Sequence, residues 1–239
     1  MRVWLQEMTG NETGWMAWCL DVDGFATWAR CEIEVLGKMP AKLAEHRAWL
    51  ASRGLASPDV GNDVRVVERV RGNEALFSPD FAPCEAEDIE RALLLLAASR
   101  ADLLRTVEAL PGEALDWDPP YRAFAAWARW RSARSILAHV ANCETHYYLP
   151  AIGHESRLPP ASPEGDWARN LAAHREETVA FLLGLKSSPD RARIDFADGE
   201  AWSVRKVLRR LVWHELLHLK SIRRIGGDFE DRGRTGRLA

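Results

Sequence analysis

The chain has 239 residues, of which 47% are apolar and 28% charged, and its formal net charge is −3. This composition is typical of globular proteins and excludes a disordered or collagen-like chain. The longest apolar run in the middle of the chain, Ala92–Ala98, is far shorter than the roughly 20 residues that cross a bilayer, so no membrane partner is expected. The N-terminus has one basic residue and no hydrophobic stretch, which predicts a cytoplasmic protein.

The cysteine spacing and the charge distribution further limit the class of protein to which the chain can belong. Four widely spaced cysteines without a CxxC pair suit a reducing compartment and disfavour a disulfide scaffold or a zinc ribbon. Residues 1–202 carry a net charge of −9 and residues 203–239 a net charge of +6. The acidic majority of the chain excludes a nucleic-acid partner, whereas the basic end favours a small anionic ligand. Four basic residues of this end are interpreted as a solvated helix face: Arg205, Lys206, Arg209 and Arg210.

Residues 1–70 predict a small α+β unit. Three segments alternate in the strand period and are separated by turns rich in Gly, Asn and Asp: residues 2–8, 14–20 and 25–29. Residues 32–52 repeat their apolar positions with a helical period, and residues 63–70 alternate again. The order is therefore β-β-β-α-β, and residues 71–84, which contain Gly and Pro, predict a linker.

Residues 85–225 predict four helices, at residues 85–110, 132–149, 166–185 and 203–225. Each has one apolar stripe, and a four-helix bundle is the arrangement that buries all four stripes together. The pair Gly226-Gly227 is expected to end the last helix, which leaves residues 226–239 as a basic tail. The predicted fold class is α+β, a small sheet domain followed by the bundle, and the 11 tryptophans supply large anchors for both cores.

The last predicted helix carries a metal-binding pattern, HELLH at residues 214–218. Histidines at i and i+4 lie on one side of a helix, so both rings can reach one ion. Both belong to the apolar stripe and point into the bundle, where His139 of the second helix can supply a third imidazole. Such a site keeps positions open for water or substrate, as catalytic metal sites do. Nickel, zinc, manganese and iron all accept imidazole, so the ligands indicate a divalent ion without choosing among these.

Other interpretations of these residues stay open. The pattern at residues 214–218 is also the HExxH motif of zinc proteases, but Ser221 and Arg224 stand where a metzincin has glycine and its third histidine. Glu215 lies off the histidine stripe, so orienting a histidine ring is favoured over acting as a general base, and no catalytic residue is assigned. Cys143, one turn after His139, is interpreted as a small buried hydrophobe before a ligand or redox group.

Two segments resemble those of a known family: Arg134–Val140 in the second helix, and Trp202–Leu208 leading to Trp213–His218 in the fourth. On these motifs residues 85–225 resemble the DinB family of four-helix-bundle metalloproteins. The resemblance implies one metal-binding histidine in the second helix and two in the fourth, which correspond to His139, His214 and His218. It also implies a homodimer, and an S-transferase or isomerase reaction that uses a low-molecular-weight thiol such as bacillithiol or mycothiol.

The N-terminal unit is similar to a HicB-type module. The similarity covers residues 14–24 and the β-β-β-α-β order. HicB proteins are antitoxins that often carry a DNA-binding segment, but here no helix-turn-helix follows and the region is acidic, so the antitoxin role is not implied. The expected use of residues 1–70 is a scaffold or lid for the bundle, or a dimer contact.

The leading hypothesis is thus a cytoplasmic DinB-like metal-dependent enzyme. Its reaction would be small-molecule thiol S-transfer or a related activity at a three-histidine site. The alternative is a non-catalytic binding or interaction protein whose metal is structural or absent. A HExxH metalloprotease is a remote third hypothesis.

Overall fold

The computed structural model describes residues 1–9, 12–120, 128–197 and 199–235. Its strands are β1 (Arg2–Met8), β2 (Gly14–Trp18), β3 (Ala26–Ala29), β4 (Arg65–Arg71), β5 (Ile194–Ala197) and β6 (Glu200–Ser203). Its α-helices are α1 (Glu32–Ser52), α2 (Ala86–Glu108), α3 (Gly112–Asp116), α4 (Ala133–Cys143), α5 (Trp167–Leu185) and α6 (Val204–Thr235). Two shorter helical turns matter below: η1 (Ser78–Phe81) and the π-helical η2 (Glu144–Tyr148).

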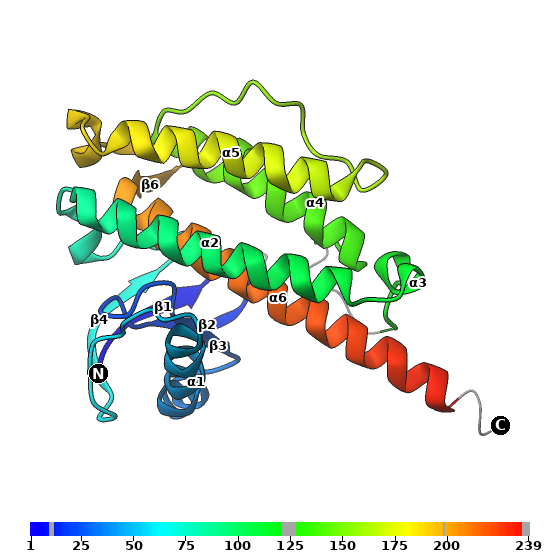
Figure 1. Cartoon of the computed structure of the whole chain (residues 1–239). Coiled ribbons are helices and arrows are strands. Elements are labelled where there is room, and N and C mark those ends of the chain that lie inside the picture. Colours follow the sequence, from blue (N-terminus) through cyan, green and yellow to red (C-terminus); the bar gives the residue numbers. More distant parts are fainter. Residues whose placement is uncertain (10–11, 121–127, 198, 236–239) are drawn as a thin grey trace.

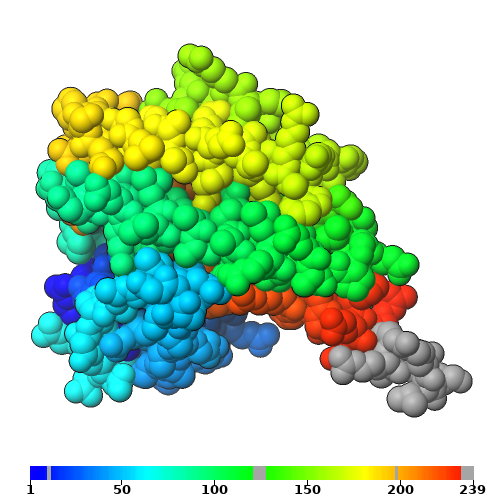
Figure 2. Space-filling view, in the orientation of Figure 1, coloured from blue at the N-terminus to red at the C-terminus, as the bar shows by residue number. Residues whose placement is uncertain are grey.

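The architecture confirms the α+β class. Figure 1 shows three layers, with α4 and α5 in the first, α2 and α6 in the second, and the N-terminal sheet with α1 in the third. The long helices α2, α4, α5 and α6 pack as a bundle. The space-filling view in Figure 2 shows the N-terminal unit pressed against the helices, while the end of α6 extends beyond them. None of the described helices is long and apolar enough to cross a bilayer.

The N-terminal sheet has the predicted β-β-β-α-β order. Its strand order is β3-β2-β1-β4, antiparallel except for the parallel β1–β4 pair, and α1 connects β3 at one edge to β4 at the other. Because successive side chains of a strand point to opposite faces, β1 supplies two cores. Val3 and Leu5 enter the main core with α1, whereas Trp4 and Met8 enter a second core together with residues of the linker and α6.

The second core joins the sheet to the helix that carries the histidine pair. The ring of Trp18 in β2 lies 5.3 Å from the ring of Trp213 in α6. The indole of Trp18 also donates a hydrogen bond to Gln6, whose amide in turn donates to the carbonyl groups of Gly72 and Asn73. Trp4 and Trp18 of the N-terminal unit therefore serve its contact with α6, which composition alone does not reveal.

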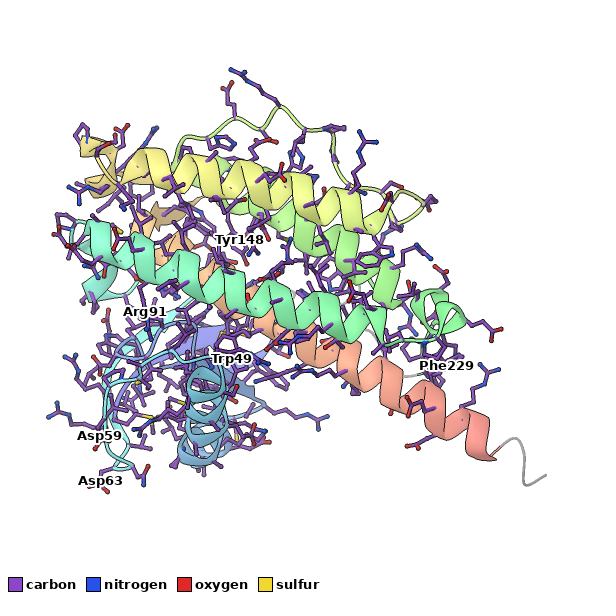
Figure 3. The ribbon with its side chains drawn as sticks, in the orientation of Figure 1. Trp49, Asp59, Asp63, Arg91, Tyr148 and Phe229 are labelled. Atoms are coloured by element: carbon purple, nitrogen blue, oxygen red, sulfur yellow. The ribbon has the colours of Figure 1, made fainter. Side chains whose placement is uncertain are left out.

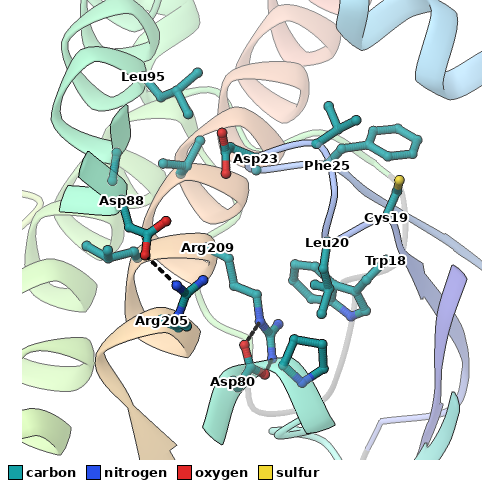
Figure 4. Close-up of a pocket in the computed structure, with 16 residues that line it drawn as sticks. Trp18, Cys19, Leu20, Asp23, Phe25, Asp80, Asp88, Leu95, Arg205 and Arg209 are labelled. Carbon is teal, nitrogen blue, oxygen red and sulfur yellow. Dashed lines mark hydrogen bonds and ion pairs between the residues drawn. The ribbon is translucent and has the colours of Figure 1, made fainter. Parts of the chain in front are cut away.

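The predicted linker, residues 71–84, is a packed segment. Phe77 is fully buried, and Asp80 at η1 forms an ion pair of 2.7 Å with Arg209 of α6. Figure 4 shows this pair beside a cavity of about 100 Å³ between the sheet, α2 and α6, together with a second pair between Asp88 and Arg205. The first pair ties the linker to α6, and the second ties α2 to α6 within the bundle. The division of the chain into domains at residues 1–70 and 85–225, with residues 71–84 between them, stays a prediction.

A second contact between the two parts lies at the end of α1. The indole of Trp49 and the guanidinium of Arg53 both donate hydrogen bonds to Asp102 of α2, at 2.7 Å and 2.6 Å respectively. Figure 3 shows Trp49 on the side of α1 that faces α2. The buried carboxylate of Asp102 is thereby satisfied by the N-terminal unit.

The expected end of the last helix at Gly226-Gly227 is wrong. The helix α6 continues to Thr235, so residues 226–235 are helical, and residues 236–239 lie outside the described part. Neither glycine adopts the positive φ of a helix-ending residue. A Cβ atom at Gly226 would lie 2.5 Å from Leu110 Cδ2, so this glycine lets the end of α2 approach α6 closely.

The second bundle helix also departs from the prediction of one α-helix over residues 132–149. The α-helical part ends at Cys143 and the chain continues as the π-helical η2. A π turn adds a residue per turn and changes which side chains face inward. As a result Tyr148 is buried, whereas Tyr147 is 42% exposed.

The hairpin β5–β6 was not predicted. Its strands pair antiparallel, and Gly199 between them has a φ of +78°, which favours glycine. The hairpin runs directly into α6, where the Ser203 hydroxyl accepts a hydrogen bond of 3.2 Å from the amide of Lys206. A glycine between two short alternating segments was the sequence signal that could have identified it.

Two glycines should respond oppositely to alanine. Gly24 has a φ of +67°, and a Cβ there would lie 2.3 Å from Val212 Cγ1 of α6, so Gly24→Ala should lower the free energy of unfolding by about 2–3 kcal/mol. Gly37 lies inside α1 with no atom within 4 Å of a Cβ, so Gly37→Ala should raise it by about 0.5–1 kcal/mol. Urea denaturation measures both, and a Gly24→Ala variant as stable as the wild type would contradict the close approach.

Candidate metal centre

Three histidines from two neighbouring helices meet inside the bundle. His139 Nε2 of α4 lies 3.1 Å from His214 Nε2 of α6, and His214 Nε2 lies 3.1 Å from His218 Nε2. The i and i+4 spacing on α6 and the packing of α4 beside α6 produce this convergence. The Nε2 atom of His214 is thus 3.1 Å from the Nε2 atoms of both other histidines. That one ion binds all three rings stays a prediction.

A cysteine joins this group. The potential ligand atoms of His139, Cys143 and His214 all lie within 4.8 Å of one another. The Cys143 Sγ atom lies 3.6 Å from both ring nitrogens of His139. The interpretation of Cys143 as mainly a packing residue therefore missed its place in the cluster. His139 and Cys143 are separated by the same i and i+4 spacing that identified His214 and His218 as a pair.

Burial keeps the three imidazoles neutral. It lowers the pKa of His139 to about 4 and that of His218 to about 3. For His214, burial and then the neighbouring ring of His218 lower the pKa well below its ordinary value. A neutral imidazole has a lone pair to offer, whereas a protonated one repels a cation. At neutral pH the cluster therefore fits a divalent metal ion without first losing a proton from a ring.

These pKa values predict how stability changes with pH in the metal-free protein. In the unfolded chain His139 binds a proton near pH 6.5 but in the folded chain only near pH 4, so acidification favours unfolding between these values. His139 alone should remove roughly 2 kcal/mol of stability between pH 7 and pH 5. Urea denaturation with a chelator present measures this, and His139→Gln should show a shallower dependence on pH. An equally steep dependence in that variant would contradict it.

Glu215 is held away from the histidines. Its carboxylate accepts hydrogen bonds from Ser99, from Arg100 Nε at 2.5 Å and from Arg175 Nη2 at 2.9 Å. These partners belong to α2 and α5, which corrects the expectation that Glu215 orients a histidine ring. The buried Nδ1 of His218, which such a carboxylate would serve, has no hydrogen-bond partner among the residues that the structure describes.

The partners of Glu215 form a buried charge network that the sequence reasoning missed. Glu144, the first residue of η2, accepts hydrogen bonds from Arg100 and Arg175, each with one contact of 2.6 Å. Burial alone would raise the pKa of Glu215, but the charges of Arg100 and Arg175 outweigh it and hold that pKa below its usual range. Two arginines and two glutamates thus compensate each other and connect α2, η2, α5 and α6 beside the histidine cluster.

Aromatic rings enclose the histidines. The ring of Trp130 stacks on that of His139, with centroids 3.5 Å apart and an angle of 11°. The ring of Tyr148 meets His214 edge-on at 5.5 Å, and Figure 3 shows Tyr148 between the helices of the bundle. Rings in these positions limit the access of water and restrict the orientation of the imidazoles.

The basic residues at the start of α6 are not a solvated face. Lys206 is fully buried and Arg210 is 6% exposed. The ammonium group of Lys206 donates hydrogen bonds of 2.7 Å to the carbonyl groups of Glu74 and Ala201, and Arg210 forms an ion pair with the Glu74 carboxylate. Their charges are used inside the protein, between the linker and α6. The excess of basic residues near the C-terminus is therefore weak support for an anionic ligand.

The comparison with known protein families is consistent with the histidine cluster in the bundle. The sequence model of the DinB superfamily matches residues 95–222, more than half of the chain. The chain belongs to the DinB superfamily. The matched segment contains all four residues of the histidine and cysteine cluster, and membership fits a divalent metal site in the bundle.

The other comparisons add no relative. No curated protein and no solved structure matched the chain. The family match begins at residue 95, so the resemblance of residues 1–70 to HicB-type modules has no support from it. What is established for this DinB superfamily member is therefore the family of its bundle and a cluster of side chains compatible with a divalent metal ion.

Proposed function

We propose that this DinB superfamily protein is a metal-dependent enzyme that carries out thiol S-transfer or a related reaction on a small molecule. Its divalent ion would be held by His139, His214 and His218. The observation that carries the proposal is the convergence of three neutral imidazole nitrogens at 3.1 Å spacings in the interior of the bundle. Such a convergence is costly without a shared ion, because buried polar atoms need partners.

The residues fit the chemistry that this function needs. A divalent ion among neutral imidazoles would lower the pKa of a water or thiol at the site and so supply an anion near neutral pH. Trp130 and Tyr148 enclose the histidines and limit the entry of water. The charge network around Glu215 ties α6 to α2 and α5, which helps to hold the two α6 histidines in place.

The protease hypothesis conflicts with the contacts of Glu215. A general base must reach the water that it activates, yet both oxygens of this carboxylate are bonded to Ser99, Arg100 and Arg175. The guanidinium charges also keep it a weak base. These contacts favour a structural role for the glutamate of the HELLH segment.

The proposed partners are a small-molecule substrate and a low-molecular-weight thiol, in a cytoplasmic homodimer. Nickel, zinc, manganese and iron are all candidates for the ion. For residues 1–70 we propose a scaffold role, which is supported by the packing of Trp18 against Trp213 on the helix that holds the histidine pair. Light scattering after size-exclusion chromatography tests the dimer.

Thiol binding to the metal-loaded protein tests the function. The purified protein would be loaded with each of the four ions in turn and titrated calorimetrically with bacillithiol and with mycothiol. Transfer of the bound thiol to a small electrophile would then be followed by mass spectrometry. We expect binding and transfer with at least one ion, and neither in the chelator-treated protein or in the His214→Ala variant.

A negative result in this thiol experiment favours the hypothesis of a non-catalytic binding protein. If the metal-loaded protein neither binds nor transfers a thiol, the enzyme hypothesis falls and a non-catalytic metal-containing binding protein remains. Copurification of a protein partner that is lost when the surface of residues 1–70 is altered would then support that alternative.

A further inference from the structure

Cys143 occupies a distinctive place in the histidine cluster. It is the last residue of α4, one helical turn after His139, at the point where the helix widens into the π turn η2. Single π turns inside helices frequently occur at functional sites. Its Sγ atom contacts both nitrogens of the His139 ring at 3.6 Å, and no other hydrogen-bond partner of this thiol is found in the described part of the chain.

The distances match those expected between ligands of one ion. Zinc bonds of about 2.0–2.1 Å to nitrogen and about 2.3 Å to sulfur, in tetrahedral geometry, separate two nitrogens by about 3.4 Å and a nitrogen from a sulfur by about 3.6 Å. The structure has 3.1 Å between the Nε2 atoms of His139 and His214, and 3.6 Å between Cys143 Sγ and His139 Nε2. Because the sulfur is equally far from both ring nitrogens, it lies over the face of the His139 ring, and the Cys143 side chain has to rotate to reach an ion on Nε2.

The other cysteines do not share these features. Cys84 is buried and its thiol contacts the backbone carbonyl of Glu85, Cys19 is buried in the sheet core, and Cys31 is exposed. The position of Cys143 beside two imidazoles is therefore not a general property of cysteines in this chain. Cys84 offers a control because its thiol lies inside the protein but outside the histidine cluster.

We propose that Cys143 binds, as a thiolate, the same divalent ion as the histidines. This inference rests on the proposed metal centre and adds a sulfur donor beside His139 and His214, whose potential ligand atoms lie within 4.8 Å of Cys143 Sγ. On binding, the thiol loses its proton to the solvent and the Sγ lone pair forms the bond to the ion. A thiolate among imidazoles favours zinc over harder ions such as manganese, so the donor set narrows the choice of metal.

Cobalt substitution tests the sulfur donor directly. The wild type, Cys143→Ser and Cys84→Ser would be loaded with Co²⁺ in the absence of any added thiol. A near-ultraviolet sulfur-to-cobalt charge-transfer band should appear in the wild type and in Cys84→Ser and be lost in Cys143→Ser. Chelator competition should show zinc affinity reduced at least about 10-fold by Cys143→Ser and unchanged by Cys84→Ser.

Two results would overturn the proposal: a cobalt-loaded wild type without this band, or a band of full intensity in Cys143→Ser. If Cys143→Ser does not fold, X-ray absorption spectroscopy of the zinc-loaded wild type decides. A sulfur neighbour at about 2.3 Å supports Cys143, and a shell of nitrogen and oxygen alone contradicts it. A wild type that binds no divalent ion would instead overturn the metal centre as a whole.

Discussion

Replacing His214 by alanine is expected to weaken divalent-metal binding by at least about 100-fold, more than the loss of a hydrogen-bond partner to a ligand usually costs. His214 is the central ring of the cluster, since its Nε2 lies 3.1 Å from the Nε2 atoms of both His139 and His218. Its removal leaves His139 and His218 as imidazole donors, without the ring that lies close to both of them. Elemental analysis of the purified variant and calorimetric titration with zinc measure the loss.

The controls separate metal binding from folding. His139→Ala should lose metal as His214→Ala does. His154→Ala should keep the full metal content, because His154 pairs with Glu177 outside the cluster. Circular dichroism establishes whether each variant is folded. Full metal occupancy in a folded His214→Ala or His139→Ala protein would rule out the three-histidine site.

Arg100→Met is expected to lower the free energy of unfolding by about 3–5 kcal/mol, the usual cost of leaving one buried charge without its partner. Arg100 is 8% exposed and pairs with Glu144 at 2.6 Å and with Glu215 at 2.5 Å. Its loss leaves two buried carboxylates that share the single positive charge of Arg175. Urea denaturation at pH 7 measures the effect.

A matched control lies on the same helix. The side chain of Arg105 is 60% exposed and pairs with Asp102, which Arg53 and Trp49 also hold. Arg105→Met should therefore change the stability by less than about 1 kcal/mol, as is typical of exposed ion pairs. Equal effects of the two substitutions would contradict the importance of the buried network.

The histidine cluster could be predicted because its spacing is local. His214 and His218 are one turn apart in any α-helix, and the apolar residues around them determine which side of α6 is buried. The inward stripe from Val204 to Ile225 is buried as expected. His139 required one more assumption, that the second and fourth bundle helices are neighbours, and the structure confirms it.

Roles that depend on partners distant in the sequence could not be predicted in this way. The helical period places Glu215 at the edge of the core, but only the packing of α2 and α5 shows that its carboxylate meets Arg100 and Arg175. The end of α6 is a similar case. A Gly-Gly pair is a common stop signal, yet here Gly226 accommodates Leu110 from the turn that follows α2.

The sequence by itself determined the α+β class, the order of the N-terminal strands and helix, the four long bundle helices, and two histidines of the candidate metal centre, because hydrophobic period and i, i+4 spacing act within one element. Only the tertiary structure decided that Cys143 joins the histidines, and that Lys206 and Arg210 are buried. It also showed that the tryptophan-rich sheet packs on the helix that holds the histidine pair. These features depend on contacts between separate elements, whose geometry is set by the packing of the whole chain.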